Sequence, residues 1–266
     1  MRKNVFLRIG TESSAIATIA YRDFTKLLRD RFRLVGSLAF PVMFVGILGG
    51  SLSASIGKGA GFDFLAFVFV GVFAQSLFQS SAAGVISLIQ DRENDFSQEL
   101  FVAPVSRYSI IFGKIFGETL VAFASGLGVI IFGFIIGVPL GFYQLILMIL
   151  AGIAACLLGG AFGIFVLSNV SSQRTVAQIF PFILFPQVFL SGVFNPVDQL
   201  PLVLTILSRI TPLTYAVDLV RHAYFGSVGE RTVAFHPAVD LVVMGALFFF
   251  FLVIGTILFI RKERNR

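Results

Sequence analysis

Six apolar segments constrain the fold of this chain more than any other feature of its sequence. Each is close to the roughly 20 residues that an α-helix needs to cross a bilayer. They lie at about residues 34–56, 64–89, 109–136, 142–167, 175–194 and 238–260. With 57% hydrophobic residues and a mean hydropathy of +0.94, the chain lies outside the soluble globular class. The sequence therefore predicts an all-α polytopic membrane protein, with six transmembrane helices in one domain that covers residues 1–266.

The segment before the first apolar run predicts an amphipathic helix over residues 12–33. Apolar side chains fall on one face at helical spacing and basic side chains on the other: Ile16, Ala20, Phe24, Leu27 and Leu28 against Arg22, Lys26, Arg29 and Arg33. A basic amphipathic helix ahead of a membrane span is typical of the cytoplasmic interface, where it contacts membrane lipid. A solvated charged linker is the alternative interpretation.

The distribution of Lys and Arg predicts the orientation of the chain. With the N-terminus inside, the cytoplasmic segments contain 16 of the 20 Lys and Arg residues, and the outer segments contain the other 4. The positive-inside rule then places both termini in the cytoplasm of a multi-pass protein of the plasma membrane. Because topology explains the net charge of +6, the basic residues do not indicate a nucleic-acid partner.

A charged segment at residues 90–107 separates the second apolar run from the third. Its polar and helix-ending residues are Asp91, Arg92, Glu93, Asp95, Glu99, Pro104 and Arg107. Each charge at bilayer depth would cost roughly 2.5–3.5 kcal/mol, so this segment cannot lie in hydrocarbon. The pattern predicts a short amphipathic helix at the cytoplasmic surface, ended by Pro104.

The region at 200–220 is apolar enough to suggest a seventh span, but it contains Arg209, Pro212 and Asp218. A seventh crossing would also put the basic C-terminal segment outside. The sequence therefore predicts two half-helices, at about 199–210 and 213–225, that enter the membrane from the outer side without crossing it. They form a re-entrant hairpin within an extracellular region at 195–236. Asp218 and Arg221 lie three residues apart, close enough to pair on one helical face and to form an extracellular gate.

Polar stripes run along the second and fifth apolar segments. In the second segment, Gln75 and Gln79 share a face, and Ser76 and Ser80 lie beside them. The fifth segment contains Gln178, Gln187, Pro181, Pro186, Phe182, Phe185 and Phe189. Polar groups inside a membrane need partners or water, so these stripes face either another helix or a wet pathway. The residues alone leave both interpretations open.

Glycine pairs four residues apart allow helix backbones to approach closely in a bilayer. Such pairs occur at Gly46/Gly50, Gly113/Gly117, Gly133/Gly137 and Gly159/Gly163. Ordinary packing within the chain is the favoured interpretation of each pair.

The sequence contains no motif for catalysis, for a metal or for a cofactor. The glycine-rich stretch at 49–59 lacks the spacing of a phosphate-binding loop, because Lys58 is followed by Gly59. His222 and His236 have no companion ligands at metal-binding spacing, and Cys156 is the sole cysteine. We therefore expect a protein that is not an enzyme.

Two stretches resemble one known family. DRE at 91–93, FSQELFVAPVSR at 96–107 and GK at 113–114 resemble the first cytoplasmic loop of ABC type-2 exporter permeases. LSGVFNPVDQLP at 190–201 and TPLTYAVDLVR at 211–221 are similar to the re-entrant extracellular helices of the same family. The pattern is closest to daunorubicin-type drug-exporter permeases. One departure is Asn94-Asp95, where many relatives have a glycine, and it affects the start of the cytoplasmic helix.

The resemblance implies the permease subunit of an ATP-driven exporter of an amphipathic drug, a lipid or a lipid-linked glycan. The 90–107 segment would dock on an ATP-binding cassette subunit, which would hold ATP and Mg. Helices two and five of two permease copies, or of this chain and a sister permease, would line the substrate pathway. On this chain the pathway residues would be Gln75, Gln79, Ser76, Ser80, Gln178, Phe182 and Phe185.

The alternative is a secondary transporter or channel driven by an ion gradient. It would need an intramembrane carboxylate or histidine as a relay. Glu118 is the sole candidate, and it lies one turn from Lys114, so a structural ion pair explains it better.

Overall fold

The computed structural model describes residues 2–51, 63–88, 106–170, 172–226 and 232–264. Every regular element within these ranges is helical, which confirms the all-α prediction for this part of the chain. The α-helices are α1 (Arg2–Arg29), α2 (Arg31–Met43), α4 (Phe64–Gly84), α7 (Arg107–Ile135), α8 (Phe142–Ser168), α9 (Gln173–Leu190), α10 (Leu202–Ile210), α11 (Pro212–Phe225) and α12 (Pro237–Arg264). A π-helix, Phe44–Gly49, continues α2, and a short 3-10 helix, Val197–Gln199, precedes α10.

Side-chain caps explain where three of the helices begin. The carboxylate of Asp63 accepts a hydrogen bond from the Ala66 N–H, and the hydroxyls of Ser106 and Ser172 do the same at the starts of α7 and α9. Each cap satisfies one of the backbone donors that a helix leaves open in its first turn. Pro41 lies in the last turn of α2, and the change to π-helix follows within three residues. The first predicted span is therefore irregular at this proline.

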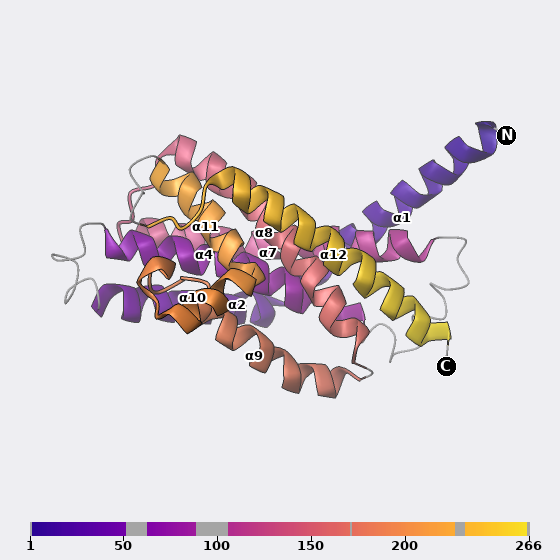
Figure 1. Ribbon diagram of the computed structural model, residues 1–266. Helices are drawn as coiled ribbons and strands as arrows, with labels where there is room; N and C mark the ends of the chain where they lie inside the picture. The colour runs from indigo at the N-terminus through magenta and orange to yellow at the C-terminus, as the bar shows by residue number, and fades with distance from the viewer. Residues whose placement is uncertain (1, 52–62, 89–105, 171, 227–231, 265–266) are drawn as a thin grey trace.

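Helix α4 lies at the centre of the bundle, between α7, α8 and α11 (Figure 1). Its phenylalanines Phe67, Phe69, Phe73 and Phe78 are completely buried. Burial of so many large apolar side chains is typical of a helix in a central position. The backbones of α8 and α4 lie in close contact. A side-chain carbon at Gly159 would clash with the carbonyl of Phe78, and one at Gly163 would clash with the carbonyl of Ala82. This glycine pair serves packing within the chain, as predicted.

Among the described residues, four helical stretches are long and apolar enough to cross a membrane: Phe64–Gly84, Ser109–Ile135, Phe142–Ser168 and Pro237–Phe259. Two shorter apolar stretches, Val35–Ile47 and Arg174–Leu190, correspond to the first and fifth predicted spans. The consecutive helices α10 and α11 are bent by 88° where they meet, as in a broken span or a re-entrant loop. The six-span count and the re-entrant hairpin remain predictions.

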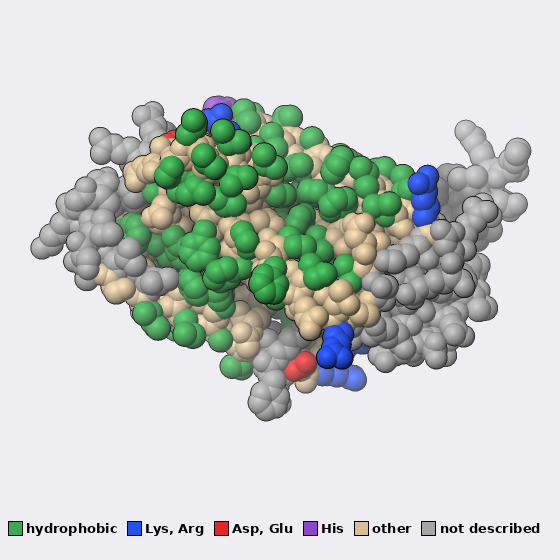
Figure 2. All heavy atoms as spheres, turned by 60° about the horizontal axis from the view of Figure 1, so that its bottom comes forward, with side chains coloured by type: hydrophobic (Ala, Val, Ile, Leu, Met, Phe, Trp, Pro, Cys, Tyr) green, Lys and Arg blue, Asp and Glu red, His purple; other side chains and the backbone are tan. Residues whose placement is uncertain are grey.

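The outer surface of the bundle is apolar. Hydrophobic side chains cover the middle of the face shown in Figure 2, and Lys and Arg lie toward its margins. Large exposed hydrophobic residues include Ile131, Phe142, Phe182, Leu202 and Val242. In water such a surface would aggregate, whereas in a bilayer it contacts lipid. The structure is thus that of a multi-pass membrane protein.

Helix α1 packs along the outside of α7, and its N-terminal end and the C-terminal end of α12 lie at the same end of the bundle (Figure 1). Of the predicted apolar face, Ala20 and Leu27 are buried, whereas Leu28 is exposed. The common location of the two ends agrees with the prediction that both termini lie on one side. Which side of the membrane this is remains a prediction.

Candidate functional site

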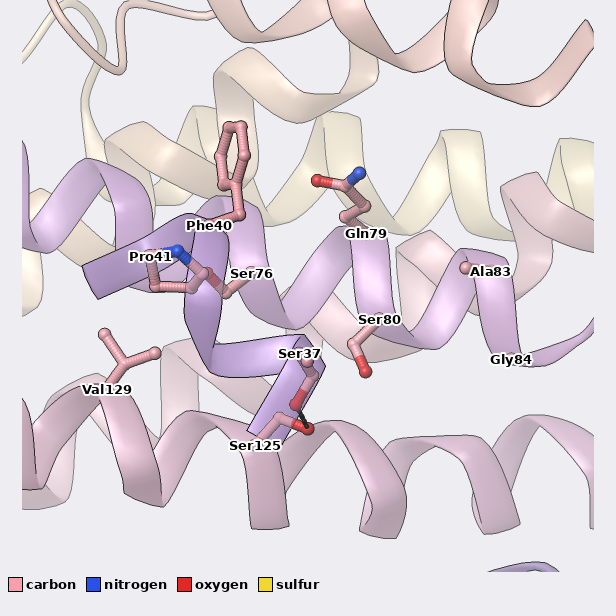
Figure 3. Close-up of a pocket in the computed structure, with 11 residues that line it drawn as sticks. Ser37, Phe40, Pro41, Ser76, Gln79, Ser80, Ala83, Gly84, Ser125 and Val129 are labelled. Carbon is pink, nitrogen blue, oxygen red and sulfur yellow. Dashed lines mark hydrogen bonds between the residues drawn. The ribbon is translucent and has the colours of Figure 1, made fainter. Parts of the chain in front are cut away.

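A polar cavity of about 440 Å³ lies between α2, α4 and α7 (Figure 3). Its walls are Gly36, Ser37, Phe40 and Pro41 from α2, Ser76, Gln79, Ser80, Ala83 and Gly84 from α4, and Ser125 and Val129 from α7. Among these lining residues none is charged, and five carry a hydroxyl or an amide. Because an apolar bundle surrounds it, the cavity is a place where a polar group could enter the membrane at low cost.

Hydrogen bonds within the walls show which polar atoms remain for a ligand. The Ser37 hydroxyl donates to the Ser125 hydroxyl over 3.1 Å and so joins α2 to α7. Ser76 donates to the carbonyl of Val72 in its own helix, which leaves its oxygen as an acceptor. The side-chain oxygen of Gln79 accepts from the NH₂ group of Gln75 over 3.3 Å, so the NH₂ group of Gln79 remains to donate to a ligand. In Figure 3 the side chain of Ser80 extends toward Ser37 and Ser125, and that of Gln79 leaves α4 in the opposite direction.

The structure brings together three of the predicted pathway residues, Gln79, Ser76 and Ser80. Gln75 does not line the cavity: it is buried behind Gln79, with a carbonyl oxygen that has no hydrogen-bond partner among the described residues. The contributions of Ser37 from α2 and Ser125 from α7 were missed. Isolated serines in apolar segments give no periodic signal, so only their spatial meeting reveals them.

The three pathway residues predicted on α9 lie elsewhere. Gln178, Phe182 and Phe185 are exposed on the outside of α9, and the two phenylalanines line a small apolar hollow of about 230 Å³ with Pro181 and Pro186. Within one chain the stripes on α4 and α9 therefore form two separate surfaces. Whether they line a common pathway remains a prediction.

The predicted docking residues Asp91, Arg92, Glu93, Asp95, Glu99 and Pro104 lie outside the described residues. Arg107 is the first residue of α7. The described residues on either side of this segment are held by hydrogen bonds. The Ser87 hydroxyl donates to the Gly84 carbonyl over 2.7 Å and shares its proton with a Glu118 carboxylate oxygen 3.3 Å away. The Ser106 N–H donates to the Glu12 carboxylate over 3.0 Å.

Asp218 and Arg221 do not form the predicted ion pair with each other, although both side chains are described and buried. The Asp218 carboxylate accepts from the Ala234 N–H over 2.9 Å and from the Phe235 N–H over 2.8 Å. The Arg221 guanidinium donates to the carbonyls of Gly192 and Val193. The prediction of a pair was wrong because two separate loops supply backbone partners, one loop for each charge.

Three side chains of α11 hold the same residue of the segment before α12. Tyr215 stacks on the Phe235 ring with centroids 5.4 Å apart, Asp218 accepts from its N–H, and His222 Nε2 lies 2.9 Å from its carbonyl oxygen. The carbonyl accepts, so Nε2 carries the proton in this contact. These residues follow each other at spacings of three and four, which places them on one face of α11. The face fixes the start of α12.

Comparison with known proteins shows the family. Residues 14–225 match the family model described as ABC-2 type transporter, which is most of the chain. The chain belongs to this family of transport permeases. The permease is 28% identical over 213 residues to nodulation protein J of Rhizobium leguminosarum bv. trifolii, a match that covers 78% of this chain and 76% of that protein.

Two further relatives are named as permeases. The putative transport permease ycf38 of Cyanophora paradoxa is 25% identical over 207 residues, with 76% of this chain and 71% of the relative covered. The inner membrane transport permease YadH of Escherichia coli K12 is 27% identical over 184 residues, with 68% and 70% covered. The ABC type-2 resemblance is thereby confirmed, and membership of the family implies a partner subunit that binds ATP. The likeness to drug exporters remains a prediction.

Proposed function

We propose that this permease is the transmembrane subunit of an ATP-driven exporter that moves an amphipathic or lipid-like substrate out of the cytoplasm. The observation that carries this proposal is the uncharged polar cavity inside an apolar bundle. Its hydroxyl and amide groups suit the polar part of such a molecule, and the lipid-facing surface of the bundle suits its apolar part. A drug, a lipid or a lipid-linked glycan would meet these requirements.

The ATPase activity is proposed to reside in a separate ATP-binding cassette subunit, which would hold ATP and Mg and dock on residues 90–107. A second permease, identical or a sister chain, would complete the pathway. Support for this pairing comes from α9, whose polar and aromatic face is exposed in a single chain. In a pair of permeases, Gln178, Phe182 and Phe185 could approach the cavity of either copy.

Filling the cavity tests the proposed pathway. Ser80→Leu adds bulk to its wall, and we expect ATP-dependent transport by the purified permease–ATPase complex to fall by about tenfold or more. Ala246→Leu adds the same kind of bulk on the exposed side of α12, so it is the matched control and should transport like the wild type. Equal transport by the two variants would mean that the substrate does not pass through this cavity.

The proposed topology has six spans, with α2 and its π-helix as the first and α9 as the fifth. The α10–α11 hairpin stays on the outer side, with Asp218 and Arg221 holding the outer gate. Thiol labelling tests this arrangement in a Cys156→Ala background. Gln199→Cys near the hairpin should react with a membrane-impermeant reagent in intact cells, and Arg174→Cys only after permeabilisation. Both positions are exposed, whereas Ser208 at the hairpin is completely buried and would be a poor probe.

One observation favours the ion-gradient alternative. Asp240, in the first turn of α12, is completely buried, and neither of its carboxylate oxygens has a hydrogen-bond partner among the described residues. An intramembrane carboxyl group of this kind could carry a proton. If Asp240→Asn abolished transport and a proton gradient drove it without ATP, the exporter proposal would be wrong.

A further inference from the structure

A buried charge cluster joins α1 to α7 near the 90–107 segment. The Lys114 ammonium lies 2.6 Å from Asp23 Oδ2 on α1 and 3.1 Å from Glu118 Oε1 on its own helix. The side chains of Lys114, Asp23 and Glu118 are only 1–3% exposed. Arg22 adds a second cation, 3.1 Å from the other Asp23 oxygen. Two cations thus balance two carboxylates, which makes burial of the cluster possible.

The backbones of α1 and α7 also pack closely at this cluster. A side-chain carbon built at Gly113 would lie 3.1 Å from the Ile16 Cα, and one at Gly117 would lie 3.0 Å from the Ala20 Cα. Glycine is the residue that permits so close an approach. Helix α1 therefore packs on the predicted glycine pair of α7, and the ion pair of Lys114 with Asp23 lies directly beside this contact.

The cluster also touches α4 and the polar cavity. Glu118 fills the space beside Gly84, since any side chain at that glycine would clash with its carboxylate. Gly84 is in turn a wall residue of the cavity. The hydroxyl of Ser87, three residues beyond α4, donates to the Gly84 carbonyl over 2.7 Å and shares this proton with the same carboxylate, 3.3 Å away. One group of charges thus contacts α1, α7 and the end of α4, at the point where the chain enters the 90–107 segment.

We propose that Asp23, Lys114 and Glu118 are positioning residues that fix α1 and α7 into one rigid unit and hold the end of α4 against it during transport. The inference rests on the proposed function for its transport readout, but the rigid unit itself can be measured without transport. The contacts of Ser87 and Glu12 hold the described residues on either side of the 90–107 segment to this unit, one through α7 and the other through α1. A displacement of the segment would therefore reach α1, α7 and the cavity wall together.

A cross-link between α1 and α7 tests the rigid unit directly. A side-chain carbon at Gly113 would lie 3.2 Å from the Ile19 Cβ, a little under the usual spacing of about 3.5–4.5 Å in disulfides. Ile19→Cys with Gly113→Cys, in a Cys156→Ala background, should therefore form a disulfide under mild oxidation in membranes, once α1 has given way by a few tenths of an ångström at Ile16. We expect Lys114→Met to slow its formation by about fivefold or more, because α1 is then released. No disulfide, or equal rates in both proteins, would overturn the proposal.

The same protein, assembled with its ATP-binding subunit, tests the role in transport. ATP-driven transport per complex should be unchanged by the disulfide, because α1 and α7 already move together. Loss of transport on oxidation and its return on reduction would mean that α1 moves against α7, and the proposal would be wrong. If the wild-type complex shows no ATP-driven transport at all, the proposed function fails, and the cross-linking rates still decide the rigid unit.

Variants of the cluster separate positioning from mere stability. Lys114→Met should lower transport per assembled complex by about tenfold while ATP hydrolysis stays within about twofold, and the disulfide should restore transport. Where Lys114→Met is not recovered from membranes, Asp23→Asn can replace it, because it keeps an acceptor for Lys114. It should also lower transport more than ATP hydrolysis, but by less than Lys114→Met does. If transport and hydrolysis fall in proportion, and the disulfide restores neither, the cluster is structural only.

Discussion

The two ends of the bundle hold their buried charges in different ways. Near the 90–107 segment, Lys114 and Asp23 neutralise each other across two helices. On α11, at the other end, Asp218 and Arg221 are three residues apart, and each takes its partners from the backbone of a different loop. Charges of the first kind fix helices to one another, and charges of the second kind fix loops to a helix. The difference predicts different consequences when a charge is removed.

The largest effect is expected at Lys114. Lys114→Met leaves two buried carboxylates without their shared cation, and removal of one partner from a buried ion pair costs about 3–5 kcal/mol. The thermal unfolding of the purified permease in detergent should report this loss. Arg29→Met removes an exposed cation from α1, the helix that carries Asp23, and should change the stability by less than about 0.5 kcal/mol. Similar losses in the two variants would contradict a buried, balanced cluster.

A smaller and more local loss is expected at Arg221. Its guanidinium lies 3.6 Å from the centre of the Phe67 ring and donates to two carbonyls of the loop after α9. Arg221→Met keeps the apolar stem but leaves these carbonyls unsatisfied, at a cost of about 1–3 kcal/mol. Hydrogen exchange should rise in residues 191–199 and not in α7. Equal increases at both ends of the bundle would refute the distinction between the two kinds of charge.

These contacts show how far the sequence could predict the structure. Hydrophobic runs and turn residues predicted α4, α7, α8, α10, α11 and α12 within a few residues of their observed bounds. Helix formation depends on near neighbours in the chain, so local pattern is sufficient for it. The pairing of Lys114 with Glu118 was predicted for the same reason.

Long-range partners could not be predicted in this way. Asp23 meets Lys114 across 91 residues, and no local pattern marks that contact. Arg221 binds backbone carbonyls, which every residue carries and which therefore leave no trace in the sequence. The cavity was half predicted: the stripe on α4 was visible, whereas Ser37 and Ser125 became wall residues only through the packing of α2 and α7.

A modest effect is expected at Asp218. Asp218→Asn keeps one carboxamide oxygen that can accept from the Ala234 or Phe235 N–H, so the loss is that of a charge-assisted hydrogen bond, about 1–2 kcal/mol. Tyr215 and His222 continue to hold Phe235 in this variant. Exchange of the Ala234 and Phe235 amides should rise, with little change elsewhere. Protection that is unchanged at these two amides would mean that the carboxylate does not hold the segment.

The smallest effect is expected at Asp240, which has neither kind of partner within the part of the chain that the structure describes. Its carboxylate lies completely buried near Asp218, and neither oxygen is hydrogen-bonded to any described residue. Asparagine has nearly the same shape and no charge, so Asp240→Asn removes the cost of burying a charge and loses no hydrogen bond. We expect the stability to stay within about 1 kcal/mol of the wild type, or to rise, in contrast to the losses at Lys114 and Arg221. A large loss in the same unfolding assay would show that Asp240 has a partner in the membrane. The buried charges at this end of the bundle would then not all depend on loop backbone for their partners.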